Sequence, residues 1–106
     1  MRYGTLLETR VVAIRADAAE TVHVRPAGAP EAARGARLVP ALTVTVPKTA
    51  GGWRPAPGEP VVLDDGTRAY PGHGNPELER LVRRLTLAYL HTEGLTADPE
   101  WGRAGA

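Results

Sequence analysis

Few side chains in this 106-residue sequence could perform acid–base chemistry or bind a metal. The three histidines are His23, His73 and His91, and no two of them have the i, i+4 or His-x-His spacing that places both imidazoles on one side of an element. The sequence has no cysteine and no serine, which excludes thiol and serine nucleophiles and Cys-based zinc sites. Any reactive site would therefore combine carboxylates and histidines from separate elements.

The nearest candidates lie in a turn and in a glycine-containing loop that follows it. One hypothesis is a metal site made of Asp64, Asp65 and His73. Another is a small acid–base enzyme that uses His73, Asp64 or Tyr70. The Asp65-Gly66 turn explains both carboxylates without either hypothesis, and adjacent strand residues point to opposite faces. We therefore predict no catalytic residue, no metal site and no cofactor.

Residues 75–94, NPELERLVRRLTLAYLHTEG, have the signature of one helix of about five turns. Asn75 is a suitable N-cap, Pro76 a suitable first residue, and Gly94 can adopt the left-handed conformation that ends a helix. At about 100° per residue, one stripe is predicted to face the core. Its members are Leu78, Leu81, Val82, Leu85, Ala88 and Tyr89.

The opposite side of this helix is a predicted partner-binding surface. It consists of Arg80, Arg83, Arg84, Leu87 and His91, with Leu90 at its margin. A leucine surrounded by arginines is typical of a contact with another protein, either a second copy or a neighbour in a larger assembly. Arginines at i, i+3 and i+4 could instead contact phosphates, and a solvated charged face is the simplest alternative.

Trp53 and Arg54 are the second predicted partner-binding element. They lie in the segment PKTAGGWRPAPGEP, where prolines and glycines leave few core contacts for a large aromatic side chain. Trp and Arg are enriched among residues that dominate binding energy at interfaces. The alternative is that Trp53 folds back and plugs an open end of the sheet, because a core without phenylalanine needs other aromatic residues.

The first half of the sequence predicts β-strands. Residues 6–15 and 21–25 are rich in β-branched side chains and are predicted to form a hairpin around residues 17–19. A longer strand is predicted over residues 38–46, with an edge or bulge at Pro40. Period-two alternation places Leu42, Val44 and Val46 inward and Thr43 and Thr45 outward.

A second hairpin is predicted between residues 61–63 and 67–70. Asp65-Gly66 can supply the positive φ values of a type I′ turn between them. Two segments rich in Pro, Gly and Ala, residues 26–37 and 47–60, are predicted to be mobile loops. The sequence thus predicts a single α+β domain over residues 1–94, followed by a C-terminal tail over 95–106. Its fold is a small, mostly antiparallel sheet or partly open barrel of about five strands, with one long C-terminal helix packed on it.

Charge and hydropathy restrict the classes of partner. Thirteen basic and twelve acidic residues give a net charge of +1, and Lys48 is the only lysine. Strong nucleic-acid binding usually needs a larger basic excess, so nucleic acid is the less favoured partner. The first twenty residues contain no apolar run long enough for a signal peptide or a membrane span, so we expect no membrane partner and a cytoplasmic location, or a place within a virion-like particle.

Residues Thr43 to Gly66, TVTVPKTAGGWRPAPGEPVVLDDG, resemble the swapped-hairpin transcription regulators of the AbrB and antitoxin type. In those regulators a strand, an Ile-Pro-Lys sequence, a short helix, a Pro-Gly-Asp turn and a second strand follow one another. Here Val46-Pro47-Lys48 and Pro57-Gly58-Glu59 match, whereas the residues between them form a poor helix sequence. The resemblance covers less than a quarter of the chain and implies a DNA-binding regulator.

Three functions follow from these patterns. The favoured one is a non-enzymatic assembly or adaptor subunit that acts through protein–protein contacts, with a homo-oligomer expected. Such a subunit could belong to a larger homo- or hetero-oligomeric particle such as a phage-like neck, tail or shell. The first alternative is a small DNA-binding regulator or antitoxin-like module, and the second is the small acid–base enzyme.

Overall fold

The computed structural model describes residues 8–15, 21–24, 27, 35–38, 41–72 and 74–104. The predicted turn at 17–19, Pro40 and His73 lie outside these residues. The elements, in chain order, are β1 (Glu8–Arg15), β2 (Thr21–Val24), β3 (Gly35–Leu38), β4 (Ala41–Thr49), β5 (Gly52–Trp53), β6 (Val61–Leu63), β7 (Arg68–Ala69), α1 (Pro76–Thr92) and α2 (Pro99–Ala104).

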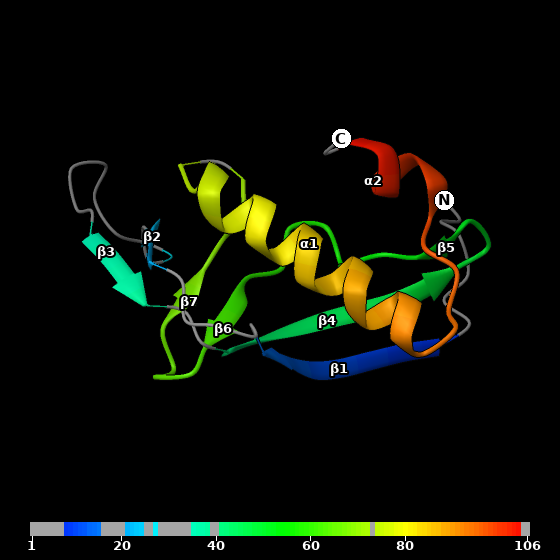
Figure 1. Cartoon of the computed structure of the whole chain (residues 1–106), viewed down its shortest axis with the longest axis horizontal. Coiled ribbons are helices and arrows are strands. Elements are labelled where there is room, and N and C mark those ends of the chain that lie inside the picture. Colours follow the sequence, from blue (N-terminus) through cyan, green and yellow to red (C-terminus); the bar gives the residue numbers. More distant parts are fainter. Residues whose placement is uncertain are drawn as a thin grey trace.

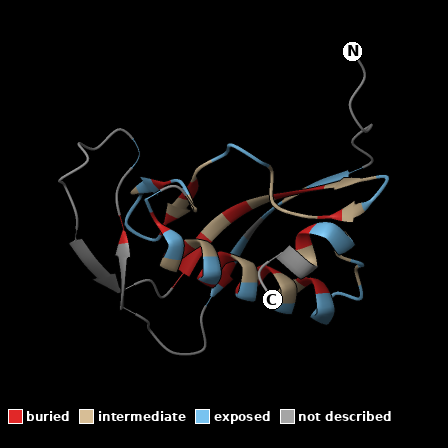
Figure 2. Cartoon of the chain, turned by 90° about the horizontal axis from the view of Figure 1, so that it is seen from above, coloured by how far each residue is buried: buried red, intermediate tan, exposed pale blue. Residues whose placement is uncertain are grey.

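The architecture is an open antiparallel sheet with one main helix across it (Figure 1). Five strands form this sheet in the order β1-β4-β6-β7, with β5 also pairing with β4, while β2 and β3 form a separate two-stranded ribbon. The buried residues lie between α1 and the sheet (Figure 2). The predicted α+β fold class is confirmed. Neither α1 nor α2 combines the length and apolarity needed to cross a bilayer, within the part of the chain described.

β4 is the central strand, and its alternating sequence explains its position. Leu42, Val44 and Val46 are at most 2% exposed and face α1, as predicted. Thr43 and Thr45 alternate with them and are half-buried on the other face. The predicted strand over 38–46 is wrong in its limits, because Leu38 ends β3 and β4 runs from Ala41 to Thr49.

The predicted hairpin between the first two strands is wrong. β1 pairs along its whole length with β4, from Glu8 opposite Lys48 to Arg15 opposite Ala41, and β2 pairs with β3 instead. A central strand needs backbone hydrogen-bond partners on both edges, and β1, with eight residues, is long enough to pair with nearly all of the nine-residue β4. Residues 17–19, Asp-Ala-Ala, also lack the Asn-Gly or Gly-Gly sequence that favours a tight hairpin.

β5 and β6 pair with the same edge of β4 and are separated by a looped-out segment. The backbone N–H of Ala56 donates to the Thr45 carbonyl (3.0 Å), and Val62 is paired with Thr43. Between these two pairs β4 advances by two residues, from Thr45 to Thr43, whereas the opposing chain advances by six, from Ala56 to Val62. Four residues, 57–60, are therefore looped out of the ladder. Pro57 and Gly58, with φ of 77° at Gly58, have the residue types of a type II turn. The segment 47–60 therefore contains β5 and this proline-rich bulge.

The hairpin between β6 and β7 is present, but its turn differs from the prediction. Gly66 has φ of 87°, whereas no described residue other than glycine has positive φ, so Asp65 cannot occupy a type I′ turn. The Gly66 N–H donates to the Leu63 carbonyl (2.9 Å), and the Leu63 N–H donates to the Thr67 carbonyl (2.8 Å). This pattern is a three-residue loop with glycine in the left-handed position.

α1 begins and ends close to the predicted residues. Asn75 is the N-cap residue, but its side chain makes no cap hydrogen bond and instead donates to the Tyr70 carbonyl (3.1 Å). At the other end, Gly94 has φ of 71°; its N–H donates to the His91 carbonyl and the Leu95 N–H to that of Leu90. These two bonds form a Schellman motif.

The core face of α1 differs from the prediction near its C-terminal end. Leu78, Leu81, Val82 and Leu85 are buried as predicted. Ala88 is exposed and Tyr89 half-buried, whereas Leu90, predicted at the margin of the partner surface, is 1% exposed. The reason is tertiary, because Leu95 and Ala97 pack against the core and so enlarge the apolar surface that this end of the helix meets.

Residues 95–104 pack against the end of the sheet. The Trp53 N–H donates to the Thr96 carbonyl (3.0 Å), and the Asp98 N–H donates to the Trp53 carbonyl (2.8 Å). α2 follows directly and buries Trp101, which is 8% exposed. The segment predicted as a tail thus contains a bridge to β5 and a short helix.

Candidate functional site

Trp53 is part of the core. Its side chain is 3% exposed and belongs to the same apolar cluster as Leu42 and Leu78. Such a residue cannot contact a partner while the chain stays folded this way. The prediction of Trp53 as an exposed binding residue is therefore wrong, and its alternative, a plug at the end of the sheet, describes its position.

Arg10 of β1 covers the ring of Trp53, with its guanidinium carbon 5.3 Å from the ring centre. Its Nη1 donates to the Tyr89 hydroxyl (3.4 Å), and its Nη2 lies 3.5 Å from a carboxylate oxygen of Glu8. The hydrogen bond to Tyr89 raises the pKa of Arg10 above its usual value. The cation therefore stays charged at any physiological pH and contributes no pH dependence there.

The predicted helix surface is only partly available to a partner. Arg80, Arg84 and His91 are exposed, and Leu87 is half-buried. Arg83 is different, because its side chain is only 13% exposed. The arginine arc therefore contributes fewer outward cations than the sequence indicates.

Arg83 is held by three contacts inside the chain. It donates one hydrogen bond to the Trp101 carbonyl and another to the Glu79 carboxylate. Its guanidinium also lies over the Trp101 ring, 4.9 Å from the ring centre. Arg83 of α1 thus connects this helix to α2 through its contacts with the Trp101 carbonyl and ring. Sequence reasoning missed this role because Trp101 lies 18 residues away in a segment predicted to be a tail.

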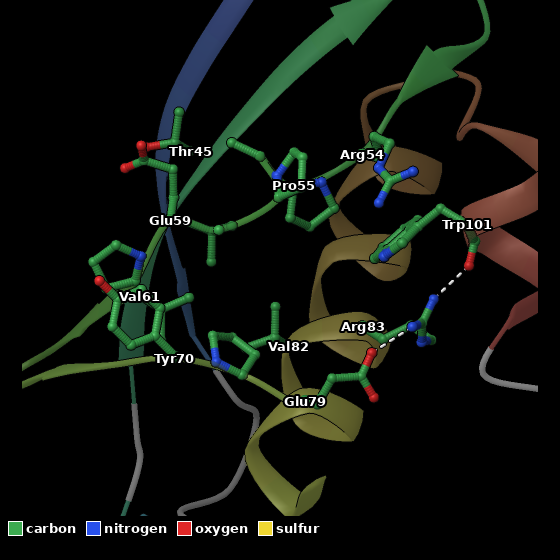
Figure 3. A pocket seen from close by; sticks show the side chains of 16 residues that line it. Thr45, Arg54, Pro55, Glu59, Val61, Tyr70, Glu79, Val82, Arg83 and Trp101 are labelled. Carbon is green, nitrogen blue, oxygen red and sulfur yellow. Dashed lines mark hydrogen bonds and ion pairs between the residues drawn. The ribbon is translucent and has the colours of Figure 1, made fainter. Parts of the chain in front are cut away.

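A cavity of about 230 Å³ opens beside this cluster (Figure 3). Its walls are the bulge after β5, the Tyr70-Pro71 segment and the side of α1 that carries Val82. Arg54 lines the cavity near Trp101, so this predicted binding residue belongs to a concave site. The sequence signal for the cavity is the high proline content of residues 55–60, a stretch that the sequence alone predicts to be part of a mobile loop.

The residues considered for catalysis are placed only in part, because His73 lies outside the described residues. Asp64 and Asp65 are exposed in the β6–β7 turn, and the Asp65 side chain accepts a hydrogen bond from the Thr67 N–H (2.9 Å). Tyr70 is 44% exposed beside the cavity. No group of three or more potential metal ligands occurs among the described residues, which do not include His73.

β1 has one edge that pairs with no other described strand. Thr45 and Pro47 of β4 accept hydrogen bonds from the β5 side, so they direct their backbone groups away from β1. The alternate residues of β4, including Val44 and Val46, therefore direct their backbone N–H and C=O groups toward β1, where they are paired with Val12 and Arg10. The remaining residues of β1 direct their N–H and C=O groups to the open edge. They are Thr9, Val11, Ala13 and Arg15.

No protein-family model, curated protein or solved structure matches this chain. Its function has to be inferred from the cavity, the free edge of β1 and the exposed side of α1.

Proposed function

We propose that the protein is a non-enzymatic assembly or adaptor subunit that joins other subunits through protein–protein contacts, beginning with a second copy of itself. The observation that supports this proposal most is the open edge of β1. Over eight residues this strand pairs only with β4 among the described elements, and it presents a row of backbone donors and acceptors at its other edge. Such an edge is a template for pairing with a strand of another chain.

The side chains of β1 favour pairing. Val11 is 68% exposed, the most exposed large apolar side chain in the described residues, and Ala13 beside it is exposed as well. Edges that avoid association usually carry lysine, proline or inward-pointing charges. Arg10 of β1 points inward over Trp53, but β1 has no lysine and no proline, and its centre, Val11-Val12-Ala13, carries no charge. A second strand on this edge would also cover Val11.

The exposed side of α1 is a second contact surface for the assembly. Arg80, Arg84 and His91 surround the half-buried Leu87 there. Arg84 lines a shallow hollow together with Ala13 and Arg15 of β1, so this helix surface adjoins the free edge and can extend the same contact.

The test is the molar mass in solution, measured by light scattering over a wide concentration range at low and high salt. We expect a mass above the 11.3 kDa of the monomer that persists at high salt, because backbone pairing and apolar contact are weakly screened. Ala13→Pro removes an N–H that points to the open edge and should yield a folded monomer whose melting temperature no longer depends on protein concentration. Val12→Pro is the matched control, since it removes a donor that faces β4 and should destabilise the fold.

Two outcomes would contradict the proposal. A strict monomer at every concentration would exclude self-assembly, and an Ala13→Pro variant that associates like the wild type would exclude the β1 edge. Duplex DNA added to the same samples tests the regulator alternative. That alternative has only Arg80 and Arg84 as outward arginines on α1, so we expect no complex at low salt.

A further inference from the structure

The cavity beside Trp101 is built from rigid parts. Four prolines line it, Pro55, Pro57, Pro60 and Pro71, and each restricts the backbone torsion of the wall that carries it. Val44, Val61 and Val82 are buried at its base on the sheet and α1. A cavity held open by such walls is suited to a ligand that enters without a large rearrangement.

Arg54 brings an unpaired cation to this cavity. Its guanidinium makes no hydrogen bond and no ion pair with any described residue, and its Nε atom is buried without an acceptor. Arg10 and Arg83 also have a buried, unpaired Nε, but their terminal nitrogens have partners in the chain. Of these three arginines, only Arg54 has no partner for its terminal nitrogens among the described residues. Its two Nη atoms are not among the buried unpaired atoms, so they are open to solvent and accessible to a ligand.

The charge of the surroundings indicates what kind of ligand suits these atoms. Of the two carboxylates on the wall, Glu79 is paired with Arg83, and Glu59 is drawn at the opposite end of the cavity from Arg54 (Figure 3). Within the described ranges, Arg54 thus has no neutralising carboxylate at ion-pair distance. The two Nη donors of a guanidinium match a carboxylate, which they can bind through two hydrogen bonds.

We propose that this cavity is a binding site for a carboxylate carried on a small, flat apolar group. The Nη atoms of Arg54 hold the carboxylate, while Trp101 and the neighbouring proline walls contact the apolar part. The volume of about 230 Å³ is below that of most drug-sized pockets, so the ligand has about the size of benzoate. Its source is a free organic acid or the C-terminal carboxylate of a peptide. This site is independent of the β1 edge.

The test follows the two tryptophan indole N–H signals by NMR as benzoate is added. We expect saturable, millimolar binding that shifts the Trp101 signal, with the buried Trp53 signal as an internal control. Benzamide has the same ring without the charge and should bind about tenfold more weakly, as should benzoate with Arg54→Gln. Arg80→Gln, on the exposed side of α1, is the matched control and should change nothing.

A peptide arm separates the two sources of carboxylate. A short peptide ending in phenylalanine with a free C-terminus is compared with the same peptide as a C-terminal amide. Tighter binding of the acid peptide than of benzoate assigns the site to a chain terminus, and the reverse assigns it to a small organic acid.

Three results would overturn the proposal. They are equal binding of benzoate and benzamide, unchanged binding to Arg54→Gln, and no saturable shift at Trp101 with any carboxylate. The melting temperature supplies a further check, because terminal nitrogens without a partner in the chain do not stabilise the empty fold. Arg54→Gln should therefore leave the melting temperature unchanged or raise it, and a clear fall would assign Arg54 a structural role instead.

Discussion

Trp53 and Trp101 both lie beneath an arginine, but the two pairs are built differently. Trp53 is 3% exposed within the core, and its partner Arg10 has a side chain that is 35% exposed. At the other site both members are enclosed, since Trp101 is 8% exposed and the Arg83 side chain, bonded to Glu79 and to the Trp101 carbonyl, is 13% exposed. The guanidinium-to-ring distances are similar, 5.3 and 4.9 Å, so cation–π geometry alone does not distinguish the two pairs.

The two pairs differ in how much the tryptophan and the arginine each contribute to the free energy of folding. In the first pair the aromatic ring fills the core and the arginine covers it from outside, so removing the ring should be costly and removing the arginine cheap. In the second pair the arginine connects α1 to a six-residue helix near the end of the chain, so removing the arginine should release that helix.

The largest effect is expected for Trp53→Ala. It empties a fully buried aromatic site and should lower the free energy of unfolding by about 3–5 kcal/mol. Denaturant unfolding, followed by circular dichroism, measures the change. Trp101→Ala is the comparison and should cost less, about 1–3 kcal/mol, because α2 can detach without opening the core. Equal losses for the two variants would mean that both tryptophans belong to one cooperative core.

The next effect concerns the contact that joins the two regions. Gly52 has φ of 128°, and a Cβ there would lie 2.8 Å from the Asp98 backbone nitrogen and 3.0 Å from the Ala97 carbonyl carbon. Gly52→Ala should therefore separate residues 96–98 from β5, at a cost of about 3 kcal/mol.

Gly58→Ala is the matched control for Gly52→Ala. Gly58 also has positive φ, 77°, but no described atom lies within 4 Å of the position that an alanine methyl would occupy there. Only the backbone strain remains, so we expect a loss of about 1–2 kcal/mol. Thermal unfolding of both variants provides the comparison, and an equal effect would show that strain rather than close approach explains Gly52.

Sequence patterns predict the elements whose signals are local. The alternation of Leu42, Val44 and Val46 and the period of Leu78, Leu81 and Val82 correspond to a real strand face and a real helix face. Gly94 ends α1 because the residue type and the left-handed conformation match. These features depend on neighbours a few residues away, which a sequence window contains.

The candidate site depends on contacts that no sequence window contains. Arg83 and Trp101 are 18 residues apart, and Arg10 and Tyr89 are 79 apart. Arg83 looks like any outward arginine by helical period, and only the return of the chain after Gly94 covers it. The predicted partner of β1 is wrong for a similar reason, because a nearby strand in sequence is not always the neighbour in the sheet.

The two arginines provide the next test of the comparison. Arg83→Met keeps much of the side-chain length but removes the hydrogen bond to Trp101 and the charge over its ring, so we expect a loss of about 1–2 kcal/mol. Arg10→Met should cost less than about 1 kcal/mol, because the bonds of Arg10 are long and partly exposed. Urea unfolding of both variants measures the difference, and a reversed order would contradict the assignment of Arg83 as the structural arginine.

A small effect, confined to the second pair, is expected for Asp98→Ala. The Asp98 side chain accepts a hydrogen bond from the Glu100 N–H (3.0 Å), which places it as an N-cap of α2. Its backbone N–H, bonded to the Trp53 carbonyl, is unaffected by the substitution. Loss of the cap should cost about 1 kcal/mol and increase hydrogen exchange in residues 99–104. Exchange at β4 should stay unchanged, because that core is completed by Trp53 rather than by α2. Faster exchange at β4 would instead mean that the two Arg–Trp regions unfold together.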